Sequence, residues 1–151
     1  MFKKIIIFNT LIFILISCSN KSNDTLDIVP VDSTKSFSVL GYCTPAPENA
    51  FNVRYSIVNK TIAESNFDYN NINFYYRASK NLDELLALYD NLKEYKTYTD
   101  NETGIEVIME TYDKEYIAHW NVKGIYYSLS GGDENELYNL ALILIKNKAL
   151  N

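Results

Sequence analysis

The residue types that most often perform chemistry are scarce in this chain. Among its 151 residues there is one histidine, His119, and there are two cysteines, Cys18 and Cys43. A structural or catalytic zinc site needs several such ligands, and a nucleophilic hydroxyl or thiol needs a base beside it. The sequence therefore predicts no metal, no cofactor and no catalytic residues, and we expect a protein that is not an enzyme.

His119 lies in a segment in which apolar and polar residues alternate. The apolar positions are Tyr116, Ala118, Trp120 and Val122. Alternation of this kind is typical of a β-strand with one buried face. We expect Trp120 to be buried against the C-terminal helix and His119 to face solvent, with a role as general base as the alternative for His119.

Two short motifs resemble functional loops only superficially. In Asp100–Gly104 the glycine comes one position too early for an EF-hand calcium loop, and the glutamate is misplaced. In Ser128–Gly132 the glycine that a nucleophile elbow requires two residues before its serine is missing. We interpret the first as a hairpin tip and the second as a strand that runs into a helix cap.

The tyrosines, thirteen in number, are the feature most open to a ligand-binding function. Tyr75 and Tyr126 fall on the polar faces of predicted strands, and an aromatic ring with a polar tip contacts a glycan or a peptide at low entropic cost. Arg77 also lies opposite the main apolar stripe, where it would pair with a carboxylate or receive an acidic ligand. We take these three residues as candidate ligand or partner contacts. The alternative is that the tyrosines only cover a half-exposed sheet.

The N-terminus has the pattern of a targeting segment. Lys3 and Lys4 precede an apolar run, Ile5–Ile16, which is too short to span a bilayer. Leu15-Ile16-Ser17-Cys18 is similar to the lipobox of bacterial lipoproteins. The resemblance implies cleavage of residues 1–17, acylation of Cys18, and a membrane-lipid anchor on the extracytoplasmic face of the cell membrane. The alternative is a plain secretory signal with an incidental cysteine.

The remainder of the chain is acidic. Removing residues 1–17 takes two of the 14 basic residues and none of the 19 acidic ones, which leaves a formal charge of −7. Nucleic-acid binding is not expected, since it requires clustered lysine and arginine. Residues 18–35 are polar and contain Pro30, so we predict a flexible tether there and a single domain at 36–151. Cys43 is expected to be a small buried apolar residue, with an intermolecular bridge or a reactive thiol as the alternative.

Strands and two helices are predicted from hydrophobic periodicity. A capping box at Asn81 and Glu84 begins a short amphipathic helix, and a second at Asp133 and Glu136 begins a longer one. The pattern predicts an α+β domain: a curved antiparallel sheet of about six or seven strands packed on a C-terminal helix, with one short helix inserted mid-chain. The predicted strands are 51–57, 61–69, 72–78, 94–99, 105–111, 116–122 and 125–130.

This order of elements, with five sequence segments, resembles an uncharacterised domain of clostridial lipoproteins. A related domain of unknown function lies outside the membrane on some anti-sigma-factor-like proteins. The segments are Tyr55-Ser56-Ile57-Val58, Ile62-Ala63-Glu64, Tyr75-Tyr76-Arg77-Ala78-Ser79-Lys80, Ala118-His119-Trp120 and Gly124-Ile125-Tyr126-Tyr127-Ser128-Leu129-Ser130. They are apolar and aromatic patterns rather than chemical signatures, so the resemblance carries no catalytic residue across.

Three functions are compatible with these features. The one we favour is a membrane-anchored, non-catalytic binding or scaffold module of the cell envelope, with a glycan or an envelope protein as partner. The second is a regulatory or sensory module of an anti-sigma-type system, which depends on analogy alone. The third is a hydrolase whose site the sequence does not reveal.

Overall fold

The computed structural model describes residues 25–149, apart from the side chains of residues 94, 95 and 149. The predicted signal segment and Cys18 lie outside the described residues. Within residues 25–149, none of the helices has the length and the apolar composition needed to cross a membrane.

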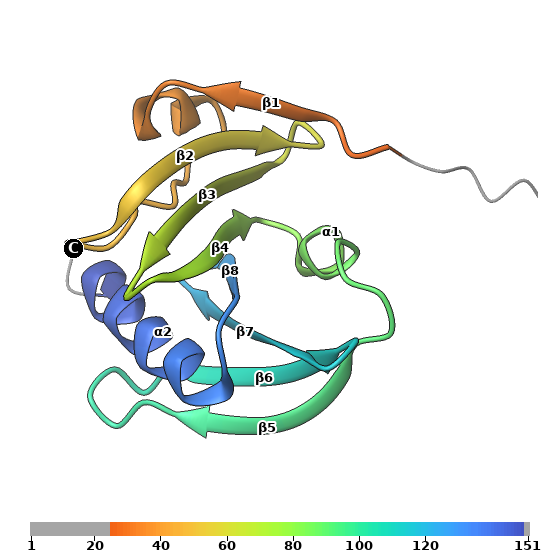
Figure 1. Ribbon diagram of the computed structural model, residues 1–151, viewed down its shortest axis with the longest axis vertical. Helices are drawn as coiled ribbons and strands as arrows, with labels where there is room; N and C mark the ends of the chain where they lie inside the picture. Colours follow the sequence, from red (N-terminus) through yellow and green to blue (C-terminus); the bar gives the residue numbers. More distant parts are fainter. Residues whose placement is uncertain (1–24, 150–151) are drawn as a thin grey trace, which may run out of the picture.

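Within residues 25–149, eight antiparallel strands form one sheet, in the order β1-β2-β3-β4-β8-β7-β6-β5. Each half of the sheet is a sequential meander, and the halves join where β4 pairs with β8 (Figure 1). The predicted α+β class is therefore confirmed, with eight strands in place of six or seven. The strands are β1 (Ile28–Val31), β2 (Phe51–Val58), β3 (Ile62–Tyr69), β4 (Ile72–Ser79), β5 (Lys93–Thr99), β6 (Glu106–Tyr112), β7 (Glu115–Val122) and β8 (Ile125–Ser130).

In the described part of the chain, three helical segments accompany the sheet: η1 (Thr34–Val39), α1 (Leu82–Leu86) and α2 (Glu134–Ala149). The predicted capping box of α2 is present, because Asp133 Oδ1 accepts from the backbone N–H of Glu136 at 3.0 Å while Glu136 Oε2 accepts from that of Asp133 at 3.1 Å. At α1, Asn81 caps as predicted, but its own N–H bonds to Ser79 Oγ at 3.0 Å rather than to Glu84.

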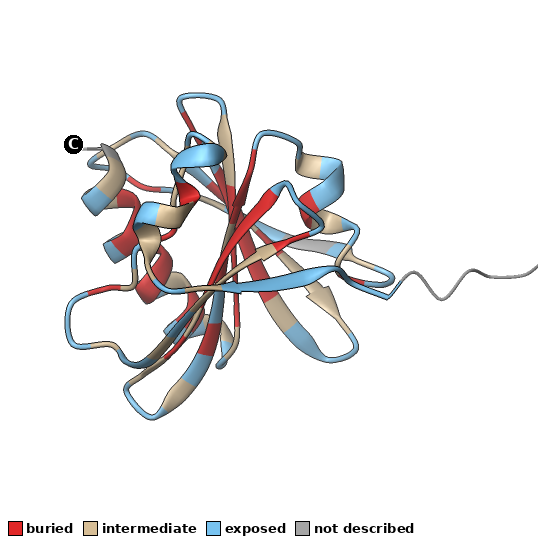
Figure 2. Ribbon diagram, turned by 90° about the horizontal axis from the view of Figure 1, so that it is seen from above, coloured by how far each residue is buried: buried red, intermediate tan, exposed pale blue. Residues whose placement is uncertain are grey.

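One face of the sheet packs against α2 and forms the main core. Tyr76, Trp120 and Tyr127 stack there with ring centroids 5.8 to 6.1 Å apart. Trp120 is 2% exposed and belongs to one cluster with the apolar stripe of α2, which confirms its predicted burial. Figure 2 shows the buried residues concentrated in the middle of the strands and on α2.

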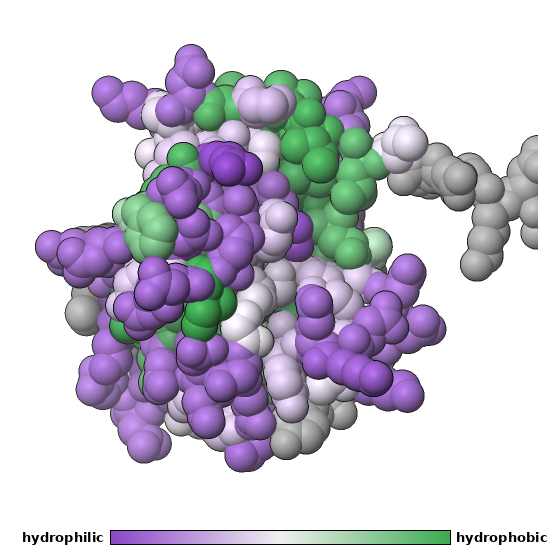
Figure 3. All heavy atoms as spheres, viewed as in Figure 1, coloured by the Kyte–Doolittle hydropathy of each residue, from purple (hydrophilic) through white to green (hydrophobic). Residues whose placement is uncertain are grey.

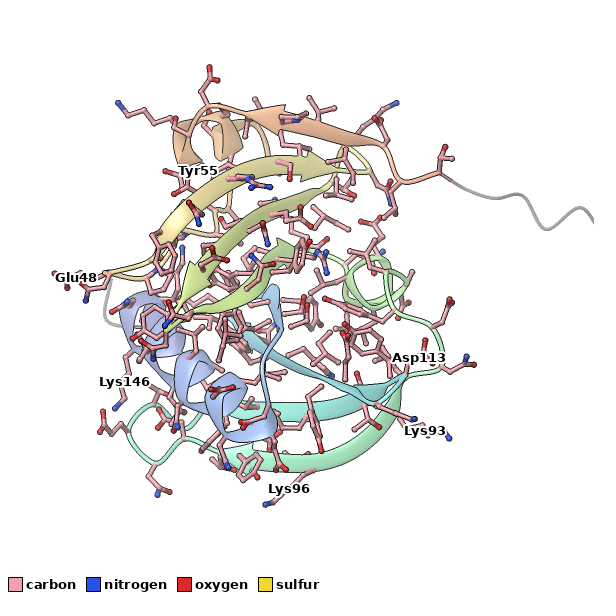
Figure 4. The ribbon with its side chains drawn as sticks, in the orientation of Figure 1. Glu48, Tyr55, Lys93, Lys96, Asp113 and Lys146 are labelled. Atoms are coloured by element: carbon pink, nitrogen blue, oxygen red, sulfur yellow. The ribbon has the colours of Figure 1, made fainter. Side chains whose placement is uncertain are left out.

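The predicted tether is wrong for residues 28–31, which form the edge strand β1. The pairing runs from Ile28 opposite Val58 to Val31 opposite Tyr55. Isoleucine and valine favour a pleated strand, and an edge strand tolerates Pro30 because one side of it makes no ladder hydrogen bonds. The helix η1 then buries Phe37 against Tyr55, with ring centroids 6.0 Å apart (Figure 4 labels Tyr55). The folded part thus begins before residue 36.

Candidate functional site

The face of the sheet opposite α2 carries a row of polar side chains that crosses five strands. We call it the polar row: Ser56, Glu64, Arg77, Ser128 and His119. The register pairs each of these residues with the next across β2, β3, β4, β8 and β7. Residues directly opposite on neighbouring strands point to the same face, so their side chains lie side by side.

Arg77 is the centre of this row and is already paired. Its Nε lies 2.7 Å from Glu64 Oε2, and Ser56 Oγ donates to the same carboxylate at 2.9 Å. Burial alone would lower the pKa of Arg77, but interactions with Tyr89 and Glu64 outweigh it and raise that pKa, so the guanidinium stays charged. Of the two predicted roles for Arg77, pairing with a carboxylate is the one observed.

The same guanidinium supports Tyr75. The guanidinium carbon of Arg77, Cζ, lies 4.9 Å from the centroid of the Tyr75 ring and 5.4 Å from the centroid of the Tyr89 ring. Tyr89, which follows α1, accepts from Arg77 Nη1 at 2.5 Å and donates to Ser130 Oγ at 3.3 Å. Tyr75 is 40% exposed. A cation–π contact of this kind favours the orientation in which the Tyr75 ring lies over the guanidinium.

Tyr75 lines a cleft of about 340 Å³, which we call the Tyr75 cleft. Across it, the hydroxyl of Tyr112 donates to Glu115 at 2.8 Å, and the Tyr112 ring meets Tyr89 edge-on at 4.8 Å. Burial is the largest cause that raises the pKa of Tyr112, and the contact with Glu115 is the next largest, so the phenol is neutral. The lining residues are Asn73, Tyr75, Tyr112, Glu115, Ser130, Gly131 and Gly132.

A second cleft, of about 450 Å³, lies beside α1, and we call it the His119 cleft. Tyr126 lines it, so the structure places Tyr75 and Tyr126 in different clefts. Its lining residues are Leu82, Thr99, Gly104, Ile105, Glu106, Ile108, His119, Trp120, Asn121 and Tyr126.

The expectation that His119 faces solvent is wrong. His119 does lie on the opposite strand face from Trp120, but it is only 5% exposed. Residues of α1 and of the loop between β5 and β6 surround that face, as Leu82 and Ile105 show. His119 Nε2 lies 3.1 Å from Glu110 Oε2, an ion-pair distance without hydrogen-bond geometry.

Ser128, His119 and Glu110 are the residue types of a hydrolytic triad, but access to the serine is lacking. Ser128 is fully buried, it lines neither cleft, and its Oγ makes no hydrogen bond among the described residues. A nucleophile must be reachable by substrate and must share a hydrogen bond with its base. The arrangement is therefore that of packed neighbours in a sheet.

The remaining sequence motifs fold locally. Asp100 Oδ2 accepts from the backbone N–H of Thr103 at 3.1 Å and from its hydroxyl at 2.6 Å, which confirms a hairpin tip. Cys43 is half-buried rather than buried, and Lys148 Nζ lies 3.3 Å from its sulfur. Among the side chains described in residues 25–149, no three of histidine, cysteine, aspartate and glutamate gather to hold a metal ion.

Sequence reasoning found Tyr75 but missed the residues that build its cleft. Tyr112 and Glu115 flank the β6–β7 turn, and Tyr89 follows α1. A sequence signal for Glu64 existed, because the short β3–β4 turn at Asn70 and Asn71 fixes a register in which Glu64 opposes Arg77.

The fold and these clefts define the class: an α+β protein with an open antiparallel sheet and two clefts on the face opposite its long helix. No protein-family model, no curated protein and no solved structure matches the chain. The resemblance to clostridial lipoproteins therefore stays a prediction from sequence.

Proposed function

We propose that this chain is a lipid-anchored, extracytoplasmic, non-catalytic binding module of the cell envelope, and that its ligand is a glycan held in the Tyr75 cleft. The observation that carries the proposal is the ring of Tyr75, which is 40% exposed and lies over the guanidinium of Arg77 on the lining of the cleft. A rigid exposed ring loses little conformational entropy when a ligand packs on it.

The chemistry of the lining suits a sugar better than a charged ligand. Sugars present C–H faces that pack on aromatic rings and hydroxyls that bond to amides and carboxylates. In the cleft, the rings of Tyr75 and Tyr112 would pack on the C–H faces of a sugar. Asn73 and Glu115 would bond to its hydroxyls. Among the described residues of this lining, Glu115 is the one formally charged side chain, so a phosphorylated or otherwise anionic ligand would be repelled.

The proposed anchor is Cys18, which lies outside the described residues. Two or more acyl chains on this cysteine would hold the protein on a membrane stably, where one chain would not. Replacing Cys18 by alanine and fractionating the cells tests this part. We expect the variant to lose both signal cleavage and acylation. Processing and membrane retention that both match wild type would contradict the anchor.

The non-catalytic part of the proposal is supported by the inaccessibility of Ser128 and the pairing of Arg77 with Glu64. Incubation of the protein with a bound glycan should release no soluble fragments. Fragment release that disappears in a His119→Ala variant of unchanged stability would contradict it.

Ligand binding is tested with the full mature chain in detergent micelles, using insoluble peptidoglycan as the probe. We expect Tyr75→Ala to weaken binding about thirtyfold or more, because removing a hot-spot aromatic costs about 2 kcal/mol or more. Phe51→Ala is the matched control, since Phe51 is an exposed aromatic, 46% exposed, that does not line the Tyr75 cleft. Equal retention of Tyr75→Ala and wild type, or an equal loss in Phe51→Ala, would overturn the assignment.

A further inference from the structure

Exposed apolar side chains gather where the chain enters the sheet. Leu26, Ile28 and Val29 are 51%, 51% and 48% exposed, and they lie within four positions of one another. We call them the β1 ridge. Figure 3 shows hydrophobic surface over β1 and the segment that leads into it. The other large apolar side chains exposed in the described residues are scattered: Val39, Phe51, Tyr75 and Ile143.

The ridge is exposed on both of its faces. Ile28 and Val29 are neighbours on the edge strand, so their side chains point to opposite faces of the sheet, yet each is about half exposed. A flat protein partner would cover one of these faces and leave the other in water. A fluid apolar medium that surrounds the edge would cover both.

The outer side of β1 is a poor template for another strand. Pro30 stands in the middle of the strand opposite Ser56 and has no backbone N–H. Proline is tolerated at an edge because its nitrogen faces outward, which leaves the free row one donor short. Strand addition by a second copy of the chain is therefore disfavoured.

The short link to Cys18 identifies what covers the ridge. Seven residues lie between Cys18 and Leu26, and the eight steps from one to the other span at most roughly 30 Å when fully extended. We infer that the β1 ridge inserts into the boundary between headgroups and acyl chains of the membrane that carries the anchor. This inference rests on the proposed lipidation of Cys18. A short link keeps the ridge at high local concentration beside the bilayer, so a small apolar surface is enough.

Charge does not drive this contact. Asp27 lies between Leu26 and Ile28 within the ridge, Asp32 follows β1, and both are exposed. One cation, Lys60, lies in the turn next to Asn59, whose N–H bonds to the Asp27 carbonyl at 2.7 Å. The acidic pair gives no net attraction to anionic lipid. Docking by apolar contact is insensitive to ionic strength, because salt screens charges and not apolar burial.

The test uses the full lipidated chain, with Cys43→Ser, in vesicles of phosphatidylethanolamine and phosphatidylglycerol. Single cysteines carrying a spin label replace Leu26, Ile28 or Val29, and collisions with oxygen are compared with collisions with a water-soluble nickel chelate. Ile143→Cys on α2 is the matched control, since Ile143 is 40% exposed. We expect oxygen collisions to exceed nickel collisions at the ridge and the reverse at Ile143, with no change when salt is added.

The outcomes separate the ridge from the anchor. Vesicle-bound chain whose ridge labels meet nickel as freely as the control label would overturn the inference and leave the anchor intact. Chain that does not float with the vesicles would overturn the anchor and the inference with it. If the spectra of the ridge labels are broadened, and the broadening disappears on dilution with unlabelled chain, the ridge contacts a second copy of the chain. That result would also overturn the inference. Leu26 lies outside β1, so its label leaves the strand pairing unchanged if the other two perturb it.

Discussion

Replacing Arg77 by methionine would remove the cation from a buried ion pair. The side chains of Arg77 and Glu64 are 13% and 9% exposed, and they approach to 2.7 Å. Removing one partner of such a pair leaves an uncompensated charge and costs about 3 to 5 kcal/mol. Glu64 keeps the hydrogen bond from Ser56, so we expect the lower end, about 3 kcal/mol. That is a large part of a typical domain stability of about 5 to 15 kcal/mol.

The assay is urea unfolding of four proteins: wild type, Arg77→Met, Glu64→Leu and the double variant. The double variant should be more stable than Arg77→Met alone, because no unpaired charge stays buried in it. Arg54→Met is the control, since Arg54 is an exposed arginine on β2, the strand beside the one that carries Glu64, and it should change stability by less than about 0.5 kcal/mol.

Two results would refute this reasoning. One is an Arg77→Met variant within about 1 kcal/mol of wild type, which is the range of a surface pair rather than a buried one. The other is a double variant whose loss equals the sum of the two single losses, because independent sites add.

Three further changes test the core, the backbone and the acid response. Trp120→Ala should cost about 3 to 5 kcal/mol in urea unfolding, and a loss under about 1 kcal/mol would contradict its place in the core. Gly131→Ala should lower the melting temperature far more than Gly124→Ala: both have positive φ, 124° and 83°, but an added Cβ meets backbone atoms only at Gly131. Equal shifts would contradict the close approach. Two asparagine amides lower the pKa of Asp68 below 3.8, so its charge stabilises the fold above that pH, and this contribution is lost as the pH falls through the folded-state pKa. Asp68→Asn should therefore lose less stability than wild type between about pH 5 and about pH 3, and parallel losses would contradict the shift.

Local periodicity was sufficient for the face of the sheet that packs on α2. Trp120 is buried where its alternation with polar neighbours predicts, because one apolar face per strand is encoded within a few residues. The same alternation correctly separates His119 from Trp120. It does not encode what covers the second face, since α1 and the loop between β5 and β6 reach that face from other parts of the chain. β1 was missed because four residues with Pro30 among them give a weak pattern until β2 pairs with them.

The Tyr75 cleft could be predicted only in part, for a topological reason. Tyr75 lies on β4, whereas Tyr112 and Glu115 lie on β6 and β7. These strands come near β4 only because β8 pairs with it, which joins the two meanders out of sequence order. A single sequence specifies the hairpins, through turns such as Asn70 and Asn71, but not this join.

The polar row also explains why the sheet has one register at the site. A slip of β4 by one residue would turn Arg77 toward α2 and the fully buried Tyr76 outward. A buried ion pair is weak evidence for stability, but a charge moved alone into the apolar core carries a large penalty. The pair of Glu64 and Arg77 therefore favours the register that also keeps Tyr75, two residues from Arg77 on β4, on the face of the Tyr75 cleft. It follows that changes at Arg77 should weaken stability and ligand retention together, whereas Tyr75→Ala should weaken retention alone.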